Sequence, residues 1–226
     1  TVSVPYTPKE EIPAEDYDLL TVYYLDDDGN IQEMAGAVYD AETGKITFTT
    51  THFSKFFIAE WINPFGDIAK GEWYYKAIRY AYTNGLVNGT GEGEFSPQAS
   101  LTRAMLITIL ARESGIDTAG GATWYIKAIE WGMSNGITDG TNPDGAITRE
   151  QFAAMLYRYA GEPDASGSLG VYTDAAQISD WATDAATWAV SRGLITGRTA
   201  TTLAPQGTAT RAEAATMLKR YMENAG

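Results

Sequence analysis

Arginine recurs at one kind of position in this sequence, where its side chain could bind an anion. Arg103, Arg149 and Arg211 stand in "LTRAM", "ITREQ" and "ATRAE", each directly after a threonine that can cap a helix. The first helical turn disfavours a cation by about 0.3–1 kcal/mol. Backbone N–H groups there attract anions, and a guanidinium adds two parallel donors suited to a carboxylate or phosphate. We interpret the three arginines as candidate anion-binding groups.

A structural interpretation of these arginines stays open beside the functional one. Each guanidinium could instead pair with an acidic residue of a neighbouring segment, because the chain has 29 Asp and Glu against 16 Lys and Arg. A second arginine follows nine residues after each of the first, at Arg112, Arg158 and Arg220. A cation in the last turns of a helix suits the helix dipole. We interpret this second series as solvated or structural.

The arginines belong to a pattern that occurs three times. A tryptophan stands 12 residues before one glycine and 16 before another in each copy. The residues in chain order are Trp73, Gly85 and Gly89; Trp124, Gly136 and Gly140; Trp181, Gly193 and Gly197. The gap from the second glycine to the arginine is 14 residues in the first and third copies and 9 in the second. A fixed spacing of this kind indicates a repeat architecture with one variable loop.

Each copy predicts two helices. Apolar residues recur at i, i+4 and i+7 from the tryptophan, which predicts a helix with one buried face, and the first glycine can end it in the left-handed conformation. The second helix begins after the capping threonine. Gln151 and Glu213 complete capping boxes with Thr148 and Thr210, whereas Met105 cannot. The sequence therefore predicts three helical hairpins.

Residues 1–62 have a different character. The stretch "LLTVYYLDDDGNIQEMAGAVYDAETGKITFTTTHFSKFFIAEW" alternates β-forming residues with turn sequences, which is typical of two or three antiparallel strands and a final one. So small a sheet needs further strands or the first repeat to cover it. The three aspartates of "DDDGN" could suggest calcium, but the spacing of an EF-hand loop is absent. A solvated turn is the favoured interpretation.

Composition restricts the function classes. The net charge of −13 and a pI near 4.4 argue against nucleic acid and anionic membranes, because phosphate binding needs clustered Lys and Arg. The chain has no cysteine and one histidine, His52, so no site of two histidines or thiols exists. The adjacency of His52 and Ser54 within one predicted strand does not identify them as a catalytic pair. We predict no cofactor and no metal site.

No apolar run approaches the roughly 20 residues of a membrane-spanning helix. The polar start "TVSVPYTPKEE" lacks a basic region followed by an apolar one, as a signal peptide would have. We therefore expect no membrane insertion, and we expect this chain to be part of a longer exported protein.

Together the spaced motifs resemble the surface-layer homology (SLH) domain. The stretch "FGDIAKGEWYYKAIRYAYTNGLVNGTGEGEFSPQASLTRAM" contains aromatic-x-Asp, Trp, the paired-glycine turn, Phe-x-Pro and the Thr-Arg motif. On this basis we expect SLH repeats at residues 63–116, 117–165 and 166–226, after a small antiparallel β segment at 1–62. The resemblance implies a mainly α fold. In it three helical-hairpin repeats form a pseudo-threefold bundle, with ligand sites in the grooves between neighbouring repeats.

The resemblance also implies a function, that of a non-catalytic module that anchors a protein to the bacterial cell wall. Family members bind secondary polysaccharides of the Gram-positive wall, often pyruvylated, and a pyruvyl carboxylate would suit the helix-start arginines. The motif matches carry the ligand-binding role onto Arg103, Arg149, Arg211, Trp73, Trp124, Trp181, Gly89, Gly140, Gly197, Asp67 and Asp174. Tryptophan at helical spacing is more often core, and the glycines can be purely structural. We expect a location at the cell surface, in the wall or S-layer.

The second copy departs from the family's pattern. It has "IDTAGGAT" where the others have "FGD" and "YTD", and its loop is five residues shorter, so we expect the three grooves to differ. A lattice-forming S-layer subunit, with other subunits as partners, is compatible with anchoring. A carbohydrate-active enzyme is the alternative from another class. It would need two carboxylates several ångströms apart, and no acidic residue recurs as the arginines do.

Overall fold

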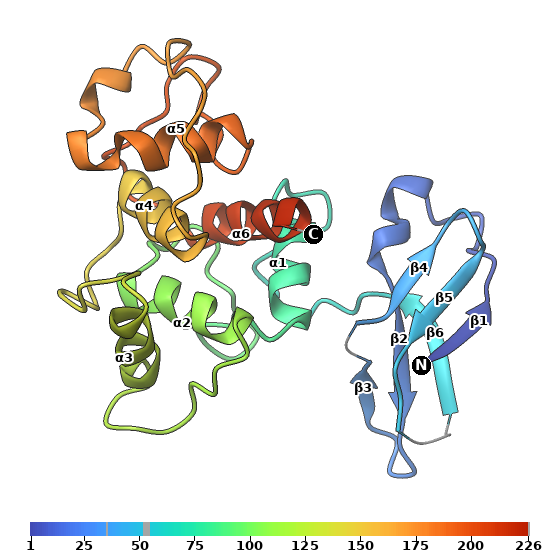
Figure 1. Cartoon of the computed structure of the whole chain (residues 1–226). Helices are drawn as coiled ribbons and strands as arrows, with labels where there is room; N and C mark the ends of the chain where they lie inside the picture. The colour runs from blue at the N-terminus through green and yellow to red at the C-terminus, as the bar shows by residue number, and fades with distance from the viewer. Residues whose placement is uncertain (35, 52–54, 226) are drawn as a thin grey trace.

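The computed structural model describes residues 1–34, 36–51 and 55–225, so His52 and Ser54 lie outside the described residues. A strand-rich N-terminal segment is joined by an extended stretch of chain to a set of helices (Figure 1). Within the described ranges, every helix is too short or too polar to span a bilayer.

The N-terminal segment forms two three-stranded antiparallel sheets, with strand orders β1-β5-β4 and β3-β2-β6. The elements are β1 Val2–Pro5, the 3₁₀ helix η1 Ala14–Leu19, β2 Leu20–Leu25, β3 Ile31–Glu33, β4 Val38–Asp40, β5 Lys45–Phe48 and β6 Lys55–Glu60. Their buried core is small and consists of Leu20, Val22, Ile46 and Phe48. The sequence predicted fewer strands, because runs of three residues such as β3 and β4 are too short to show a period of two.

The "DDDGN" stretch is a turn, as the sequence indicated. The Asp26 carboxylate accepts hydrogen bonds from the backbone N–H groups of Asp28, at 3.0 Å, and Asn30, at 2.7 Å. Among the residues that the structure describes, no cluster of three or more acidic or histidine side chains could hold a metal ion.

Each repeat contains two α helices. In the first repeat these are α1 Tyr75–Thr83 and α2 Arg103–Glu113, and in the second repeat α3 Ile126–Ser134 and α4 Arg149–Tyr159. In the third repeat they are α5 Thr183–Ser191 and α6 Arg211–Ala225, and two 3₁₀ helices, η2 Ala175–Gln177 and η3 Asp180–Ala182, precede α5. The second helices begin at the three arginines, as predicted. The hydroxyl oxygens of Thr102, Thr148 and Thr210 accept from the N–H three residues on, at 3.1–3.3 Å.

The first helices begin later than the sequence predicted. α1, α3 and α5 start two residues after their tryptophans, so the tryptophans stand before the helix and not on its buried face. Each of these helices ends two residues before a glycine. The φ angles of Gly85, Gly136 and Gly193 are +68°, +70° and +67°, which is the left-handed conformation expected there.

The helices pair across the repeats. α2 packs against α3, α4 against α5 and α6 against α1 (Figure 1). The predicted hairpins are therefore correct as successions of two helices but wrong as packed pairs. Residues 84–102 separate α1 from α2. A packed αα-hairpin typically has a loop of about 2–5 residues. The longer connection allows α2 to pack against a helix of another repeat.

A closed ring of backbone hydrogen bonds joins the three repeats. Leu101 N donates to Ala209 O, Ala209 N to Ile147 O, and Ile147 N to Leu101 O, each at 2.9 Å. All three residues are buried. Since each one immediately precedes a capping threonine, the ring fixes the starts of α2, α4 and α6 relative to one another.

The N-terminal segment packs on α1. The ring of Trp61 contacts that of Tyr75 at 5.4 Å between centroids, and Lys76 Nζ forms an ion pair with Asp18 Oδ1 at 2.7 Å. Leu19 belongs to the main helical core and not to the core of the sheets. The sequence predicted that either further strands or the first repeat would cover this small sheet. In the structure, the first repeat contacts the N-terminal segment.

Candidate ligand-binding grooves between the repeats

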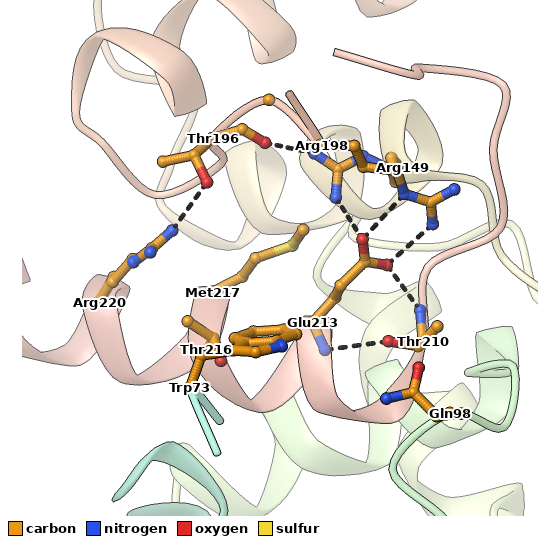
Figure 2. Close-up of a pocket in the computed structure, with 11 residues that line it drawn as sticks. Trp73, Gln98, Arg149, Thr196, Arg198, Thr210, Glu213, Thr216, Met217 and Arg220 are labelled. Carbon is orange, nitrogen blue, oxygen red and sulfur yellow. Dashed lines mark hydrogen bonds and ion pairs between the residues drawn. The ribbon is translucent and has the colours of Figure 1, made fainter. Parts of the chain in front are cut away.

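Arg149, at the start of α4 in the second repeat, reaches into the third repeat. Its side chain is 3% exposed. Nε donates to Leu203 O at 2.9 Å and Nη2 to Thr196 O at 2.5 Å, while Nη1 pairs with Glu213 Oε1 at 3.0 Å. Glu213 also accepts from Arg198, Nε to Oε1 at 3.0 Å and Nη2 to Oε2 at 3.1 Å. One carboxylate thus holds two guanidinium groups (Figure 2).

Arg211, at the start of α6, reaches from the third repeat into the first. It is 8% exposed. Nε donates to Phe95 O at 2.9 Å and Nη2 to Asn88 O at 2.7 Å, and the guanidinium carbon lies 4.3 Å from the centre of the Phe95 ring. Among the residues that the structure describes, the partner of Nη1 is the Met105 sulfur, at 3.8 Å. Burial lowers the pKa of Arg211, because desolvation disfavours the charged form.

Arg103, at the start of α2, reaches from the first repeat into the second. Nε donates to Thr141 O at 3.0 Å and Nη2 pairs with Asp139 Oδ1 at 2.7 Å. The structural interpretation of the arginines therefore holds for Arg103 and Arg149, each of which pairs with an acid of the next repeat. Arg211 differs, since it bridges the repeats through backbone carbonyls without an ion pair among the described side chains.

Asp67 and Asp174 hold the loops that receive the arginines. Asp67 Oδ1 accepts from Phe95 N at 2.8 Å, and Asp174 Oδ1 accepts from Leu203 N at 2.8 Å. The second oxygen of each carboxylate accepts from the next backbone N–H, at 2.6 and 2.7 Å. These are the segments whose carbonyls bind Arg211 and Arg149, so the two aspartates position the arginines through the backbone.

The second glycine of each turn permits close approach of the backbone. A Cβ at Gly89 would lie 2.6 Å from the Glu94 carbonyl oxygen, and one at Gly197 would lie 2.3 Å from that of Thr199. Gly140 in the second copy has a φ of +73°, which also favours glycine. The structural role that the sequence allowed for these glycines is thus visible at all three positions.

The candidate tryptophans are exposed. Trp73, Trp124 and Trp181 are 60%, 51% and 57% exposed, so their placement in the core is wrong. They precede the α helices, Trp181 lying in the short 3₁₀ helix η3, so the packing argument from α-helical spacing does not apply to them. Trp73 contacts the ring of Tyr74, and Trp124 that of Tyr125, edge to face at 5.1 Å. The indoles of Trp73 and Trp124 are therefore held in place at the surface.

Two cavities at the repeat boundaries each bring together one predicted arginine, glycine and tryptophan; the predicted residues that line neither are Arg103, Gly140, Trp181, Asp67 and Asp174. We call the larger, of about 630 Å³, the Arg149 groove (Figure 2); its lining residues are Trp73, Gln98, Arg149, Thr196, Gly197, Arg198, Thr210, Glu213, Thr216, Met217 and Arg220. We call the other, of about 360 Å³, the Arg211 groove; its lining residues are Leu86, Val87, Asn88, Gly89, Met105, Thr108, Ile109, Arg112, Trp124 and Arg211.

The two grooves are built from equivalent positions. Each combines the glycine turn and second helix of one repeat with the tryptophan of the next repeat and the helix-start arginine of the preceding one. The Arg149 groove contains three arginines and one glutamate, and the Arg211 groove contains two arginines and no acid. Both are positively charged places in a chain whose net charge is −13.

Two arginines of the second series, Arg112 and Arg220, also line the grooves, which their spacing in the sequence did not indicate. Both have structural partners, as expected, since Arg112 Nη1 donates to Leu86 O at 3.2 Å and Arg220 Nη1 to Thr196 Oγ1 at 3.4 Å. A usable signal was present. On α6 the polar residues Glu213, Thr216 and Arg220 follow one another at i, i+3 and i+7, which marks a polar stripe on a helix whose first two turns are otherwise buried.

Comparison with known proteins identifies the repeats. A family model described as "S-layer homology domain" matches residues 64–104, 117–153 and 171–215. The chain is 32% identical over 235 residues to an amylopullulanase of Thermoanaerobacterium thermosulfurigenes, covering 94% of this chain and 12% of that protein. It is 29% identical to an S-layer protein of Bacillus thuringiensis subsp. finitimus, covering 69% of this chain and 21% of that protein.

A cellulosome-anchoring protein of Acetivibrio thermocellus is 31% identical, over 61% of this chain and 35% of its own length. The chain therefore spans about a third or less of the relatives named here. The family and the surface-layer relatives indicate a location at the cell surface or cell wall. With three tandem matches that cover more than half of its length, the chain belongs to the S-layer homology domain family.

Proposed function

We propose that this chain is a non-catalytic module that anchors a bacterial protein to the cell wall. It does so by binding an anionic wall polysaccharide in the grooves between its repeats. The observation that carries the proposal is the repeated construction of the two grooves, each with a buried arginine, an exposed tryptophan and a positive charge. The proposed ligand carries carboxylates, and pyruvyl groups are the form that the family resemblance implies.

We also propose that the three repeats form one pseudo-threefold bundle. Three observations support it: the ring of hydrogen bonds through Leu101, Ile147 and Ala209, the pairing of helices across repeats, and the arginines, each of which reaches one repeat onward. A cyclic arrangement gives each repeat the same two neighbours. Equivalent grooves then arise at equivalent boundaries.

The chemistry of binding follows from the residues in the grooves. A carboxylate accepts two parallel hydrogen bonds from a guanidinium, and the apolar face of a sugar ring packs against an indole. Each groove supplies both kinds of group within one cavity. Several grooves on one chain would bind a repeating polymer with an avidity greater than the affinity of any one of them.

A glycosidase function has little support in these cavities. Hydrolysis of a glycosidic bond ordinarily requires two carboxyl groups, about 5–9.5 Å apart. Glu213 is the one acidic residue among the lining residues of the two grooves, and its two oxygens are occupied by Arg149, Arg198 and Thr210 N. The chain spans 12% of the amylopullulanase, so that protein's activity is not carried over to it.

A second proposed role is that of the wall-attached part of a lattice-forming surface-layer protein, with other subunits as partners. The S-layer relatives support it. This role is compatible with anchoring, since the repeats would hold the lattice on the wall while other parts of the subunit make lattice contacts.

Co-sedimentation with purified Gram-positive wall sacculi tests the anchoring proposal. We expect the chain to sediment with intact walls of its source and to stay in solution with walls stripped of secondary polysaccharide. Replacement of both groove tryptophans, Trp73→Ala and Trp124→Ala, should abolish sedimentation. The control is Val171→Ala, because Val171 is 58% exposed and lines neither groove. Equal sedimentation with stripped walls, or none with intact walls, would refute the proposal.

A further inference from the structure

The equivalent grooves differ at a position that decides whether the helix-start arginine has an acidic partner within the groove. The third residue after the capping threonine is Glu213 in α6 and Met105 in α2. In the Arg149 groove, Glu213 accepts from Arg149 and Arg198 at 3.0–3.1 Å, as Figure 2 shows. Glu213 therefore already occupies donors of Arg149 and Arg198, whereas Arg220 of the same groove has no acid partner among the described residues.

The Arg211 groove has no such acid. Arg211 forms no ion pair with any acidic side chain in the described part of the chain, and its Nη1 faces the Met105 thioether at 3.8 Å. A thioether sulfur is a weak acceptor. Burial lowers the pKa of Arg211, because desolvation disfavours its charged form. The negative charge of Asp67 acts in the opposite direction but is outweighed by burial. A buried charge without a counter-ion is costly, and an entering anion would supply the missing partner.

The remaining walls indicate what accompanies the anion. On one side Arg112, which has no acid partner among the described residues, adds a second positive charge. On the other sides Leu86, Val87 and Ile109 supply apolar surface, and Trp124 supplies an exposed indole. The groove fits an anionic group that carries an apolar face next to it.

We propose that Met105 makes the Arg211 groove the primary anion site of this chain, selective for a carboxylate with an adjoining apolar face. The Arg149 groove is secondary, because Glu213 competes with an external carboxylate for Arg149 and Arg198. The proposal rests on the proposed function and goes beyond it, since it ranks the two grooves and names Met105 and Glu213 as the residues that set the ranking.

Benzoate is a suitable probe, because it joins one carboxylate to one apolar face. The full chain, labelled with ¹⁵N, is titrated with sodium benzoate while the indole N–H signals of its six tryptophans are followed by NMR. Trp124→Phe and Trp73→Phe variants assign the two groove signals. We expect the Trp124 signal to saturate at about tenfold lower benzoate concentration than the Trp73 signal, which corresponds to the loss of one charge-assisted hydrogen bond.

Matched variants isolate the charge. Met105→Glu places a carboxylate beside Arg211 and should weaken benzoate binding at Trp124 about tenfold. Met105→Gln has nearly the same size without the charge and should leave binding within about twofold. Glu213→Gln removes the competing charge and should strengthen binding at Trp73, while its amide can still complete the capping box, as Gln151 does in α4.

Several results would overturn the inference. They are equal saturation of the two signals, equal effects of Met105→Glu and Met105→Gln, and tighter binding of inorganic phosphate, which has no apolar face, than of benzoate at Trp124. The wall sedimentation experiment separates this inference from the proposed function. If the chain binds walls but the two grooves bind benzoate equally, the ranking alone is refuted. If the grooves differ in benzoate affinity but the chain does not bind walls, the anchoring function alone is refuted.

Discussion

Single residues at the repeat boundaries combine structural and binding roles. Arg149 and Arg211 are buried and donate to backbone carbonyls of the next repeat, and both also line a groove. The two interpretations that the sequence left open therefore do not exclude each other. A guanidinium has five N–H donors in a fixed plane, so it can satisfy carbonyls with some donors and face a cavity with others.

Arg211→Ala should lower the free energy of unfolding by about 2–4 kcal/mol, because the carbonyls of Phe95 and Asn88 lose a charged donor. Arg211→Lys should recover part of this loss, since a lysine keeps the charge but lacks the planar fork. Urea denaturation monitored by circular dichroism measures both. Arg192→Ala, at an exposed position, is the control and should change stability by less than about 0.5 kcal/mol. An unchanged stability of Arg211→Ala would show that this arginine does not hold the repeats together.

Glu213 should make stability depend on pH in the acid range. Burial alone would raise the pKa of Glu213, but hydrogen bonds from Arg198 and Thr210 N and the charges of Arg149 and Arg198 outweigh it and lower the pKa below 4.5. A group whose pKa is lowered on folding stabilises fully above its unfolded pKa, and this contribution disappears as the pH falls through the folded pKa.

We therefore expect wild-type stability to fall below about pH 4.5, and the fall to be smaller in Glu213→Gln. Thermal unfolding between pH 3 and pH 7 measures the difference. Gln151→Glu is the matched comparison, because it introduces a carboxylate at the equivalent position of α4. Identical pH profiles of wild type and Glu213→Gln would contradict the assignment.

At the scale of elements, the glycine turns set the shape of the grooves. Gly197→Ala should destabilise the chain by about 1–3 kcal/mol, because the new Cβ would lie within 2.3–2.7 Å of two backbone oxygens and the Tyr172 ring. Gly91→Ala is the control, since its Cβ would have no neighbour within 4 Å. Melting temperatures compare the two variants. Equal melting temperatures would mean that the loop can relax around the side chain.

The beginnings of the second helices and the ends of the first helices could be predicted from the sequence because they depend on local chemistry. A capping threonine and the residue three positions on contact each other wherever the rest of the chain lies, and Thr102, Thr148 and Thr210 do so. The paired glycines and the repeat spacing are local in the same sense. These signals also led to the family and to the arginines of the grooves.

What the sequence could not show depends on contacts between distant segments. Helix pairing across repeats is decided by the loops and the ring through Leu101, Ile147 and Ala209, which no helical period reveals. Trp73, Trp124 and Trp181 fit a buried helical face by spacing, yet the helices begin two residues later. The strands β3 and β4 have three residues each, which is too short to show the alternation of apolar and polar residues that predicts a strand.

At the scale of the molecule, the repeats depend on one another. Each supplies backbone partners to the other two through the ring, and the helical core runs through all three repeats. Removal of residues 166–226 would leave Leu101 N without Ala209 O and would expose the α1 surface that packs on α6.

We therefore expect a chain truncated after residue 165 to lose cooperative unfolding, whereas the full chain should keep a cooperative transition of its helices. Urea titration followed by circular dichroism at 222 nm distinguishes the two. A chain of two repeats that unfolds in a sharp transition would show that the repeats are stable independently, as in an open solenoid.

The grooves are proposed to bind a wall polysaccharide through its carboxylates. The most direct measurement is calorimetric titration of the full chain with purified secondary wall polysaccharide, before and after chemical removal of the carboxyl-bearing substituents. We predict saturable binding to the native polymer that weakens as salt increases, because charge interactions are screened, and a loss of at least tenfold in affinity after the carboxylates are removed. Equal affinity for the two polymers would contradict the account.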